Sequence, residues 1–351
     1  MKLQKTIQAK IIGLTNIKEQ LLNQEYDNWQ RLIQSLHTNN PNCIDVYEET
    51  NLYSATKQQA LRFCRKLKKD NQPVIIRRDV FNIQKHNTNL SNYWVKIPIY
   101  KHSIKVAVKF PNNQEYLLSE SIRQAKLIKR KDKWFLNITV QKEVELKNSY
   151  SSILAIDLGE KVIATSVVSS TNNVTFYGRK VRGIRRHYAW LRKRLGEKKL
   201  SKVIKRIGQK EQRKVNDQLH KISRKIVNEA LETASVIVLG DLKGICKSAK
   251  GRRFNRIVSS MPFYKLTQYI EYKANEQGIR IFKINERGTS HTCSRCGKKG
   301  NRPKQAVFNC KHCGLKDFNA DVNGARNILK RFSGQGLENG AELAQPITIT
   351  R

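Results

Sequence analysis

The sequence predicts an α/β chain in which a mixed sheet carries an inserted cysteine-rich metal ribbon and follows an antiparallel β-domain. Two observations favour this fold class. Short apolar runs alternate with helical stretches from Ser152 onward, and two CxxC pairs lie near the C-terminal end. The 351 residues, 39% of them hydrophobic, are enough for at least one sizeable core and for two or three domains.

The first part of the chain is expected to form a β-domain with a helical insertion. Alternating apolar residues predict a strand within 1–14, and the amphipathic stretches that follow predict helices over 15–85. Between Tyr93 and Leu146, apolar runs separated by polar turns predict further antiparallel strands. We therefore expect one β-domain made of 1–14 and 86–147, with the helical segment inserted into it.

The second part of the chain is expected to form a mixed sheet. Three consecutive strands are predicted at Ile153–Ile156, Val162–Ser169 and Val174–Tyr177. Helix and strand then alternate, with a helix over about 183–232, a strand at Val236–Leu239, a helix at Pro262–Asn275 and a strand at Ile279–Ile284. This order of elements is typical of a sheet of the ribonuclease-H type.

Two segments are expected to lack regular packing. Arg252–Asn255 is predicted to form a mobile loop, and residues 333–351, which begin Ser-Gly-Gln-Gly, are predicted to form a disordered tail.

The formal net charge of +40, from 68 Lys+Arg against 28 Asp+Glu, indicates a polyanionic partner. Nineteen basic residues and three acidic ones lie between Arg179 and Lys225. A charged stretch is often only a solvated face, but like charges at this density weaken a helix unless a polyanion neutralises them. We predict a track for phosphate backbones there, made up of Arg182, Arg185, Arg186, Arg192, Arg194, Lys205, Arg206, Arg213 and Lys214.

An anionic membrane also attracts positive charge, but no segment approaches the roughly 20 apolar residues that span a bilayer. The N-terminal Met-Lys-Leu-Gln-Lys-Thr lacks an apolar signal core. We therefore expect a cytoplasmic, nucleoid-associated protein without a membrane partner.

Four of the seven cysteines form two CxxC pairs separated by thirteen residues, each pair followed by a glycine: Cys293, Cys296, Cys310 and Cys313. Two such turns complete a tetrahedral Zn²⁺ site. The alternatives are a redox dithiol or buried thiols. Four protein ligands leave no open position, so we expect a structural zinc ribbon over 291–314 whose metal is not the catalyst.

Two carboxylates lie where a catalytic metal site requires them. Asp157 ends the apolar strand in Ala-Ile-Asp-Leu-Gly, and Asp321 lies at the predicted start of the last helix. A carboxylate that ends a buried strand is unfavourable unless it is paired or binds a cation. Hydrolysis of phosphodiesters by two Mg²⁺ ions needs such a cluster. The simpler alternative is that Asp157 caps a turn and Asp321 caps a helix.

Four sequence motifs together closely resemble the TnpB (OrfB) family: Ala-Ile-Asp-Leu-Gly, Ile-Val-Leu-Gly-Asp-Leu, Thr-Ser-His-Thr-Cys-Ser-Arg-Cys-Gly and Asp-Val-Asn-Gly-Ala-Arg-Asn-Ile. The resemblance covers about 1–332 and is specific from Ser152 onward. It implies a transposon-associated, RNA-guided DNA endonuclease related to type V CRISPR effectors, with DNA and a guide RNA from its own locus as partners.

The resemblance also implies a domain organisation. The β-domain of 1–14 and 86–147 would be a β-barrel-like wedge, and 15–85 a helical recognition insertion. A RuvC-like nuclease domain, formed by 148–290 and 315–332, would then carry the zinc ribbon.

One departure from the family affects the catalytic site. The second catalytic residue of the family is usually a glutamate in a pattern like Glu-Asp-Leu, whereas this chain has Gly240-Asp241-Leu242. Three hypotheses remain open. Glu286 supplies the carboxylate from the neighbouring strand, Asp241 replaces it from a position shifted by one residue, or the protein is a nuclease-inactive DNA-binding repressor or transposition accessory protein. We prefer the first, in which Asp157, Glu286 and Asp321 bind Mg²⁺.

Overall fold

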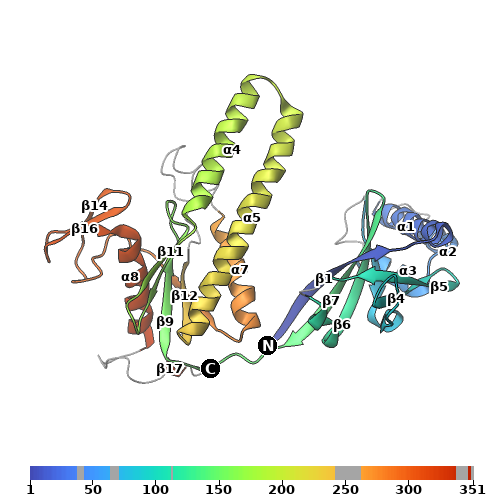
Figure 1. Ribbon diagram of the computed structural model, residues 1–351, viewed down its shortest axis with the longest axis horizontal. Coiled ribbons are helices and arrows are strands. Elements are labelled where there is room, and N and C mark those ends of the chain that lie inside the picture. Colours follow the sequence, from blue (N-terminus) through green and yellow to red (C-terminus); the bar gives the residue numbers. More distant parts are fainter. Residues whose placement is uncertain (38–42, 64–70, 112–113, 242–261, 337–346, 349–351) are drawn as a thin grey trace. The chain divides into compact units, whose positions relative to one another are not determined.

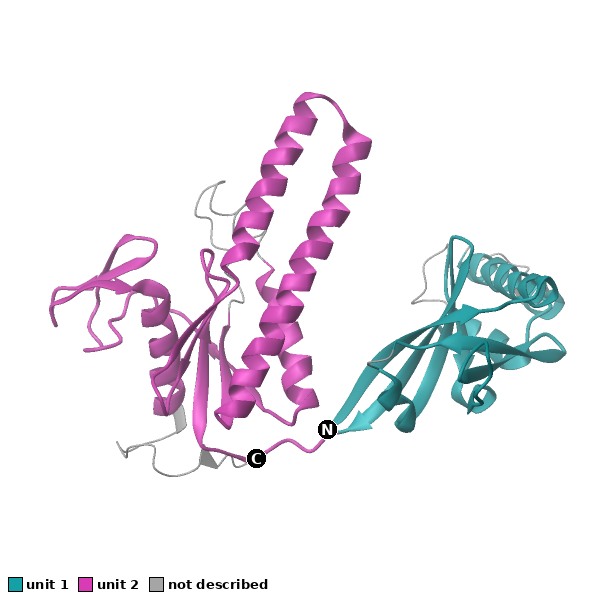
Figure 2. Ribbon diagram, in the orientation of Figure 1, with its two compact units in different colours: residues 1–143 teal, residues 144–351 magenta. Residues whose placement is uncertain are grey.

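The computed structural model describes residues 1–37, 43–63, 71–111, 114–241, 262–336 and 347–348. The chain divides into two compact units, Met1–Glu143 and Val144–Arg351 (Figure 2). This boundary lies close to the one predicted after residue 147. The predicted loop Arg252–Asn255 and most of the predicted tail lie outside the described residues. None of the described helices is long and apolar enough to cross a membrane.

The first unit contains a seven-stranded antiparallel sheet. In spatial order its strands are β2 (Val74–Arg77), β6 (Ser121–Arg130), β7 (Lys133–Glu143), β1 (Lys2–Ile12), β5 (His102–Lys109), β4 (Tyr93–Ile99) and β3 (Asn82–Lys85). Its helices are α1 (Asn16–His37), α2 (Cys43–Glu49) and α3 (Ser54–Phe63), with short 3₁₀ turns η2 (Arg78–Val80) and η3 (Glu115–Ser119). Trp29 of α1 and Trp134 of β7 are buried in the same apolar core.

Two expectations for this unit need correction. The segment 15–85 is not helical throughout, because β2 and β3 within it belong to the sheet. Val74, Ile75 and Ile76 are all buried, and an apolar run this short does not distinguish a strand from a helix by periodicity. In the described residues no pairing joins the edge strands β2 and β3, so hydrogen bonds do not close the sheet into a barrel.

The second unit is built on a five-stranded mixed sheet, as the sequence predicts. In spatial order its strands are β11 (Val174–Tyr177), β10 (Ala164–Val168), β9 (Ser152–Asp157), β12 (Ser235–Asp241) and β13 (Ile281–Asn285). β9, β10 and β11 are antiparallel, whereas β9, β12 and β13 are parallel. Figure 1 shows α8 (Ala320–Gly336) on one side of this sheet, with α5 (Ser201–Glu232) and α7 (Phe263–Glu276) on the other. Both faces are therefore covered, which explains why β9 and β12 are apolar runs without alternation.

Two predictions for this unit need correction. The basic helical region is two helices, α4 (Arg179–Glu197) and α5, which form the long hairpin in Figure 1. The chain turns between them at Lys199, whose φ is +54°. The ribbon continues beyond residue 314, because β16 (Leu315–Asn319) pairs with β15 (Val307–Cys310), next to β14 (Asn301–Lys304).

The predicted tail also begins later than expected. α8 continues to Gly336, and Phe332 in its last turns contacts Phe282 of β13 with 5.2 Å between the ring centroids. This contact stabilises the end of the helix against the sheet. Farther along, β17 (Ile347–Thr348) pairs with β8 (Ser149–Tyr150).

Candidate functional site

Three acidic side chains come from separate segments of the second unit. Asp157 is the last residue of β9, Glu286 directly follows β13, and Asp321 lies in the first turn of α8. The carboxyl ends of parallel strands meet at one edge of a sheet, which brings the ends of β9 and β13 to the same edge. Asn319, not Asp321, caps α8, since its Oδ1 accepts the N–H groups of Asp321 at 2.9 Å and Val322 at 3.1 Å.

Gly240 leaves a space beside Asp157 that the Glu286 side chain fills. The register of β9 and β12 makes Gly240 and Asp157 neighbours that face the same side of the sheet. A Cβ atom added at Gly240 would lie only 1.4 Å from Glu286 Oε1. The Glu286 carboxylate therefore occupies the position that a side chain at residue 240 would take. Alternation along β12 turns Asp241 to the opposite face.

Burial raises the pKa of all three carboxyl groups. The pKa of Asp157 is raised to about 7 by burial and by the neighbouring charge of Asp321. Burial, together with the charges of Asp157 and Asp241, raises the pKa of Glu286 to about 8. The pKa of Asp321 is also raised by burial, although two nearby cations oppose the shift. Such shifts are expected where carboxyl groups are buried close to one another.

The donor set fits divalent cations. Glu286 Oε1 is buried and, in the described part of the chain, has no hydrogen-bond partner. A buried carboxylate oxygen of this kind is unfavourable unless a cation or a donor compensates it. Among the described residues only the four cysteines are close enough together to share one ion. The carboxylates do not form such a group, and carboxylate oxygens are the donors that hard ions such as Mg²⁺ prefer.

Two asparagines of α8 hold the segment that leads into the ribbon. Asn323 Oδ1 accepts the N–H of Ser294 at 2.8 Å, and its Nδ2 donates to the carbonyl of Thr292 at 2.8 Å. Asn327 Nδ2 donates to the carbonyls of Thr289 at 2.8 Å and Thr292 at 2.7 Å. Both asparagines are buried, so these bonds fix the backbone immediately around the first cysteine.

Asn323, Asn327 and Arg331 form a polar stripe on α8, here called the α8 stripe, and Arg331 contacts the segment around Glu286. Its guanidinium donates to the carbonyls of Asn285 and Arg287, the residues on either side of Glu286. Residues 323, 327 and 331 are four apart and therefore lie on one face of the helix. The helix that carries Asp321 thus also fixes Glu286 and the start of the ribbon.

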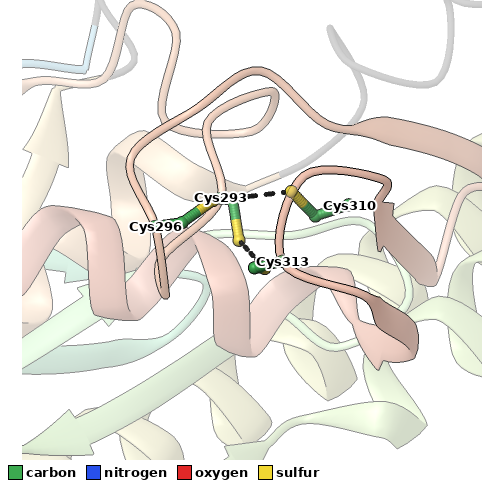
Figure 3. Close-up of side chains that lie close together, drawn as sticks. All are labelled: Cys293, Cys296, Cys310 and Cys313. Carbon is green, nitrogen blue, oxygen red and sulfur yellow. Dashed lines mark hydrogen bonds between the residues drawn. The ribbon is translucent and has the colours of Figure 1, made fainter.

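The four predicted zinc ligands converge, as Figure 3 shows for Cys293, Cys296, Cys310 and Cys313. Two pairs of their sulfur atoms lie 3.6 Å apart, and all four lie within 4.8 Å of one another. Zn–S bonds of about 2.3 Å in a tetrahedron separate the sulfurs by about 3.8 Å, which this spacing matches. Gly297 and Gly314, which follow the two turns, have φ values of +74° and +70° that glycine adopts readily.

The predicted phosphate-binding residues of α4 and α5 fall into two groups. Arg182 forms an ion pair with Glu160 at 3.2 Å, and Arg192 pairs with Glu211 of α5. Arg185 is half-buried, and burial lowers its pKa. These three side chains contact other parts of the fold, which reduces the charge they offer to phosphate. The remaining residues of the set are exposed: Arg186, Arg194, Lys205, Arg206, Arg213 and Lys214.

Sequence reasoning misses three cations near the carboxylates. Arg302 of β14 opposes the rise in the pKa of Asp157 and Asp321, and Lys161 also acts on Asp321. Arg331 acts in the same way on the third carboxyl group. Composition marks the segment between the cysteine pairs only as basic, and none of the three cations belongs to a recognisable spacing pattern. Their roles depend on which segments the fold brings together.

These features define a class of protein: a basic α/β chain with a carboxylate cluster at one edge of a mixed sheet, adjoining a four-cysteine ribbon. Residues 263–328 match the family described as Cas12f1-like, TNB domain. The TnpB-like protein MJ0751 of Methanocaldococcus jannaschii is 31% identical over 211 residues, which are 57% of this chain and 75% of that protein. The chain belongs to the TnpB family, which is related to the type V CRISPR effectors.

Other relatives are longer proteins. The CRISPR-associated endodeoxyribonuclease Cas12f2 of a Micrarchaeota archaeon is 31% identical over 246 residues, 64% of this chain and 44% of that protein. The corresponding Cas12f1 of Sulfoacidibacillus thermotolerans is 47% identical over 76 residues, 21% of this chain and 18% of that protein. The chain thus spans less than half the length of these two relatives.

The fold is similar to those of two solved complexes. A Cas12f1–sgRNA–target DNA complex aligns with a TM-score of 0.59 at 16% identity, over 89% of this chain and 82% of that chain. An AacC2c1–sgRNA–extended non-target DNA complex aligns with a TM-score of 0.53 at 9% identity, over 86% and 59%. At these identities the likeness concerns the fold alone.

Proposed function

We propose that this protein is an RNA-guided DNA endonuclease whose second unit is a RuvC-like nuclease domain. The observation that supports this most strongly is the electrostatic interaction of Asp157 with both Asp321 and Glu286, with Glu286 in the space beside Gly240. The strand order, three antiparallel strands followed by two parallel ones, is that expected of a ribonuclease-H-type sheet. The names of the Cas12f relatives and the composition of the Cas12f1 complex support DNA as substrate and a guide RNA as partner.

Asp157, Glu286 and Asp321 would hold the Mg²⁺ ions. When bound there, Mg²⁺ supplies Lewis-acid polarisation of the phosphodiester and activation of water, so no covalent protein nucleophile is needed. The carboxylates would position the ions, and Arg331 of the α8 stripe holds the backbone on both sides of Glu286. Arg302 and Lys161 add positive charge beside Asp321, which favours a bound phosphate.

The four cysteines would hold structural Zn²⁺, which supplies folding energy to a ribbon too small to fold by burial alone. The exposed cations of α4 and α5 would bind phosphate backbones of the guide RNA and its DNA heteroduplex without reading sequence. We assign the first unit the wedge and recognition roles that the family resemblance implies.

A cleavage assay tests the proposal. The protein is purified with RNA transcribed from its own locus and given double-stranded targets and Mg²⁺. Asp157→Ala and Glu286→Ala are expected to bind the target but not cut it. Asp241→Ala is the matched control, because Asp241 lies one residue beyond Gly240 on the opposite face, and it is expected to cut.

Two outcomes contradict this assignment in different ways. If Glu286→Ala cuts as well as the wild type while Asp241→Ala does not, Asp241 is the third ligand. The glycine at position 240, where the family usually has a glutamate, also favours the alternative function, a nuclease-inactive DNA-binding repressor or transposition accessory protein. That alternative holds if the wild-type complex binds targets and never cuts them.

A further inference from the structure

α4 presents one continuous exposed face that begins beside the carboxylates. Residues of an α-helix turn by about 100° each, so side chains three, four and seven apart share a face. Six exposed residues follow this spacing within about a third of the helix circumference: Arg179, Gly183, Arg186, His187, Trp190 and Arg194. The opposite face carries the buried Val181 and Tyr188, so packing of the helix does not depend on the exposed face.

The inner end of this face borders a cavity of about 360 Å³ that is also lined by Asp321. The cations Lys161, Arg179 and Arg186 and the ring of Phe176 form part of its wall. The Arg179 guanidinium lies 5.4 Å from the centroid of the Phe176 ring. A cavity that combines cations with an aromatic ring and adjoins a carboxylate site suits a phosphate and sugar of a bound strand.

Farther along the same face, away from the cavity, lies Trp190, the only tryptophan in the sequence after residue 143. Its side chain is 55% exposed, whereas Trp29 and Trp134 of the first unit are buried. The Arg194 guanidinium lies 5.8 Å from the Trp190 ring centroid, and the His187 ring lies 6.3 Å away at an interplanar angle of 31°. A large aromatic surface is thus exposed to solvent between a guanidinium, a group suited to phosphate, and an imidazole, a ring suited to stacking.

We propose that Trp190 is a stacking platform for one unpaired base of the strand that the carboxylates cleave, a role that rests on the proposed nuclease function. Seven residues separate Gly183, at the cavity, from Trp190, which corresponds to about 10 Å along the helix. At about 3.4 Å per nucleotide, this distance spans about three nucleotides of a stacked strand and fewer of an extended one. A strand whose phosphate lies at Asp321 therefore reaches Trp190 within two or three nucleotides.

The charge of the surroundings selects a nucleobase over an apolar protein surface as the occupant. Arg194 lies near the ring, Arg186 and Lys193 are exposed within about one helical turn of Trp190 along α4, and the one acidic residue of α4, Glu197, pairs with Arg194 at 3.9 Å. An apolar partner would have to desolvate these cations, whereas a polynucleotide neutralises them with its phosphates while its base covers the ring. Stacking of this kind tolerates any base, so it adds affinity without sequence preference.

The test uses the full chain with its guide RNA, in the absence of Mg²⁺ so that no strand is cut. Target DNA carrying an unpaired stretch is bound to wild type, Trp190→Ala and Trp190→Phe. Loss of stacking on one base corresponds to about tenfold weaker binding, so we expect that loss for the alanine variant and near wild-type binding for phenylalanine. Leu200→Ala is the matched control, because Leu200 is a 43% exposed apolar side chain in the turn after α4, and we expect no change.

An abasic scan identifies the base that stacks. A single abasic position is moved along the unpaired strand, and at one position, two or three nucleotides from the cut, wild type and Trp190→Ala should bind equally. Strand binding should also quench a tryptophan fluorescence component that is missing in Trp190→Phe. These readouts do not require cleavage, so they remain interpretable if the protein proves to be nuclease-inactive.

Three results overturn the proposal. The first is unchanged binding by Trp190→Ala, and the second is an equal loss for every abasic position. The third is a change in oligomeric state of the alanine variant, measured by light scattering, which would identify the ring as a contact between copies of the chain.

Discussion

Gly240→Ala is expected to abolish cleavage while leaving the fold intact. The added Cβ would lie 1.4 Å from Glu286 Oε1, 2.1 Å from its Cδ and 2.3 Å from its Cγ. Contacts of a Cβ below 3.0 Å essentially do not occur, so the carboxylate oxygen must move by at least about 1.6 Å. A misplacement of about 1 Å in an active site reduces the rate by about 100-fold, and we expect at least that loss. The displaced group is the end of a flexible side chain, so the free energy of unfolding should fall by no more than about 1–3 kcal/mol.

A sharper experiment moves the carboxylate from position 286 to position 240. Gly240→Glu places two carboxylates in one space, and Glu286→Ala leaves none, so each single variant is expected to be inactive. The double variant has one carboxylate again, now attached to β12, and is expected to recover much of the cleavage rate. Single-turnover cleavage of guided target DNA at saturating Mg²⁺ measures the rate, while DNA affinity and thermal unfolding show that each variant is folded and competent to bind.

Two results would refute this reasoning. One is wild-type cleavage by Gly240→Ala, which would show that Glu286 does not need that space. The other is a double variant that folds and binds DNA yet remains as inactive as Glu286→Ala. Either result would mean that the carboxylate beside Asp157 is not the functional replacement for the missing glutamate.

Three further outcomes are expected. Without divalent cations, the free energy of unfolding should fall as pH rises from about 4 to 8. In the folded protein Asp157 and Glu286 keep their protons up to pKa values of about 7 and 8, whereas in the unfolded chain they release them near 3.8 and 4.5. Chemical denaturation across this range checks the slope, which Mg²⁺ should remove and which a flat metal-free profile would contradict. Asn327→Ala should destabilise the protein by about 1–3 kcal/mol, since two backbone carbonyls lose their donor, and urea unfolding showing no loss would argue against the α8 stripe. Cys296→Ser should lower the zinc content and expose the ribbon to proteases with little change in helical circular dichroism; a variant that retains zinc and resists proteolysis would contradict the four-cysteine site.

The parts of the fold that follow from local pattern could be predicted from the sequence. The strands β9 and β12 are uninterrupted apolar runs, and such runs indicate strands covered on both faces. β2 was missed because four residues are too few for periodicity to identify them. The pairing of Arg182 with Glu160 and of Arg192 with Glu211 was also missed, because residues that pair across elements have no fixed spacing in the chain.

The sequence by itself predicted the cluster of four cysteines, because each CxxC turn places two sulfurs by local geometry and the two pairs are close in the chain. It also determined the excess of positive charge and the positions of Asp157 and Asp321 at the ends of their elements. Only the tertiary structure shows that the Glu286 side chain lies in the space beside Gly240. The parallel register of β12 and β13 pairs Gly240 with Ile284, and the side chain of Glu286, two residues further on, reaches back to Gly240, so this placement depends on which strands are neighbours in the folded sheet.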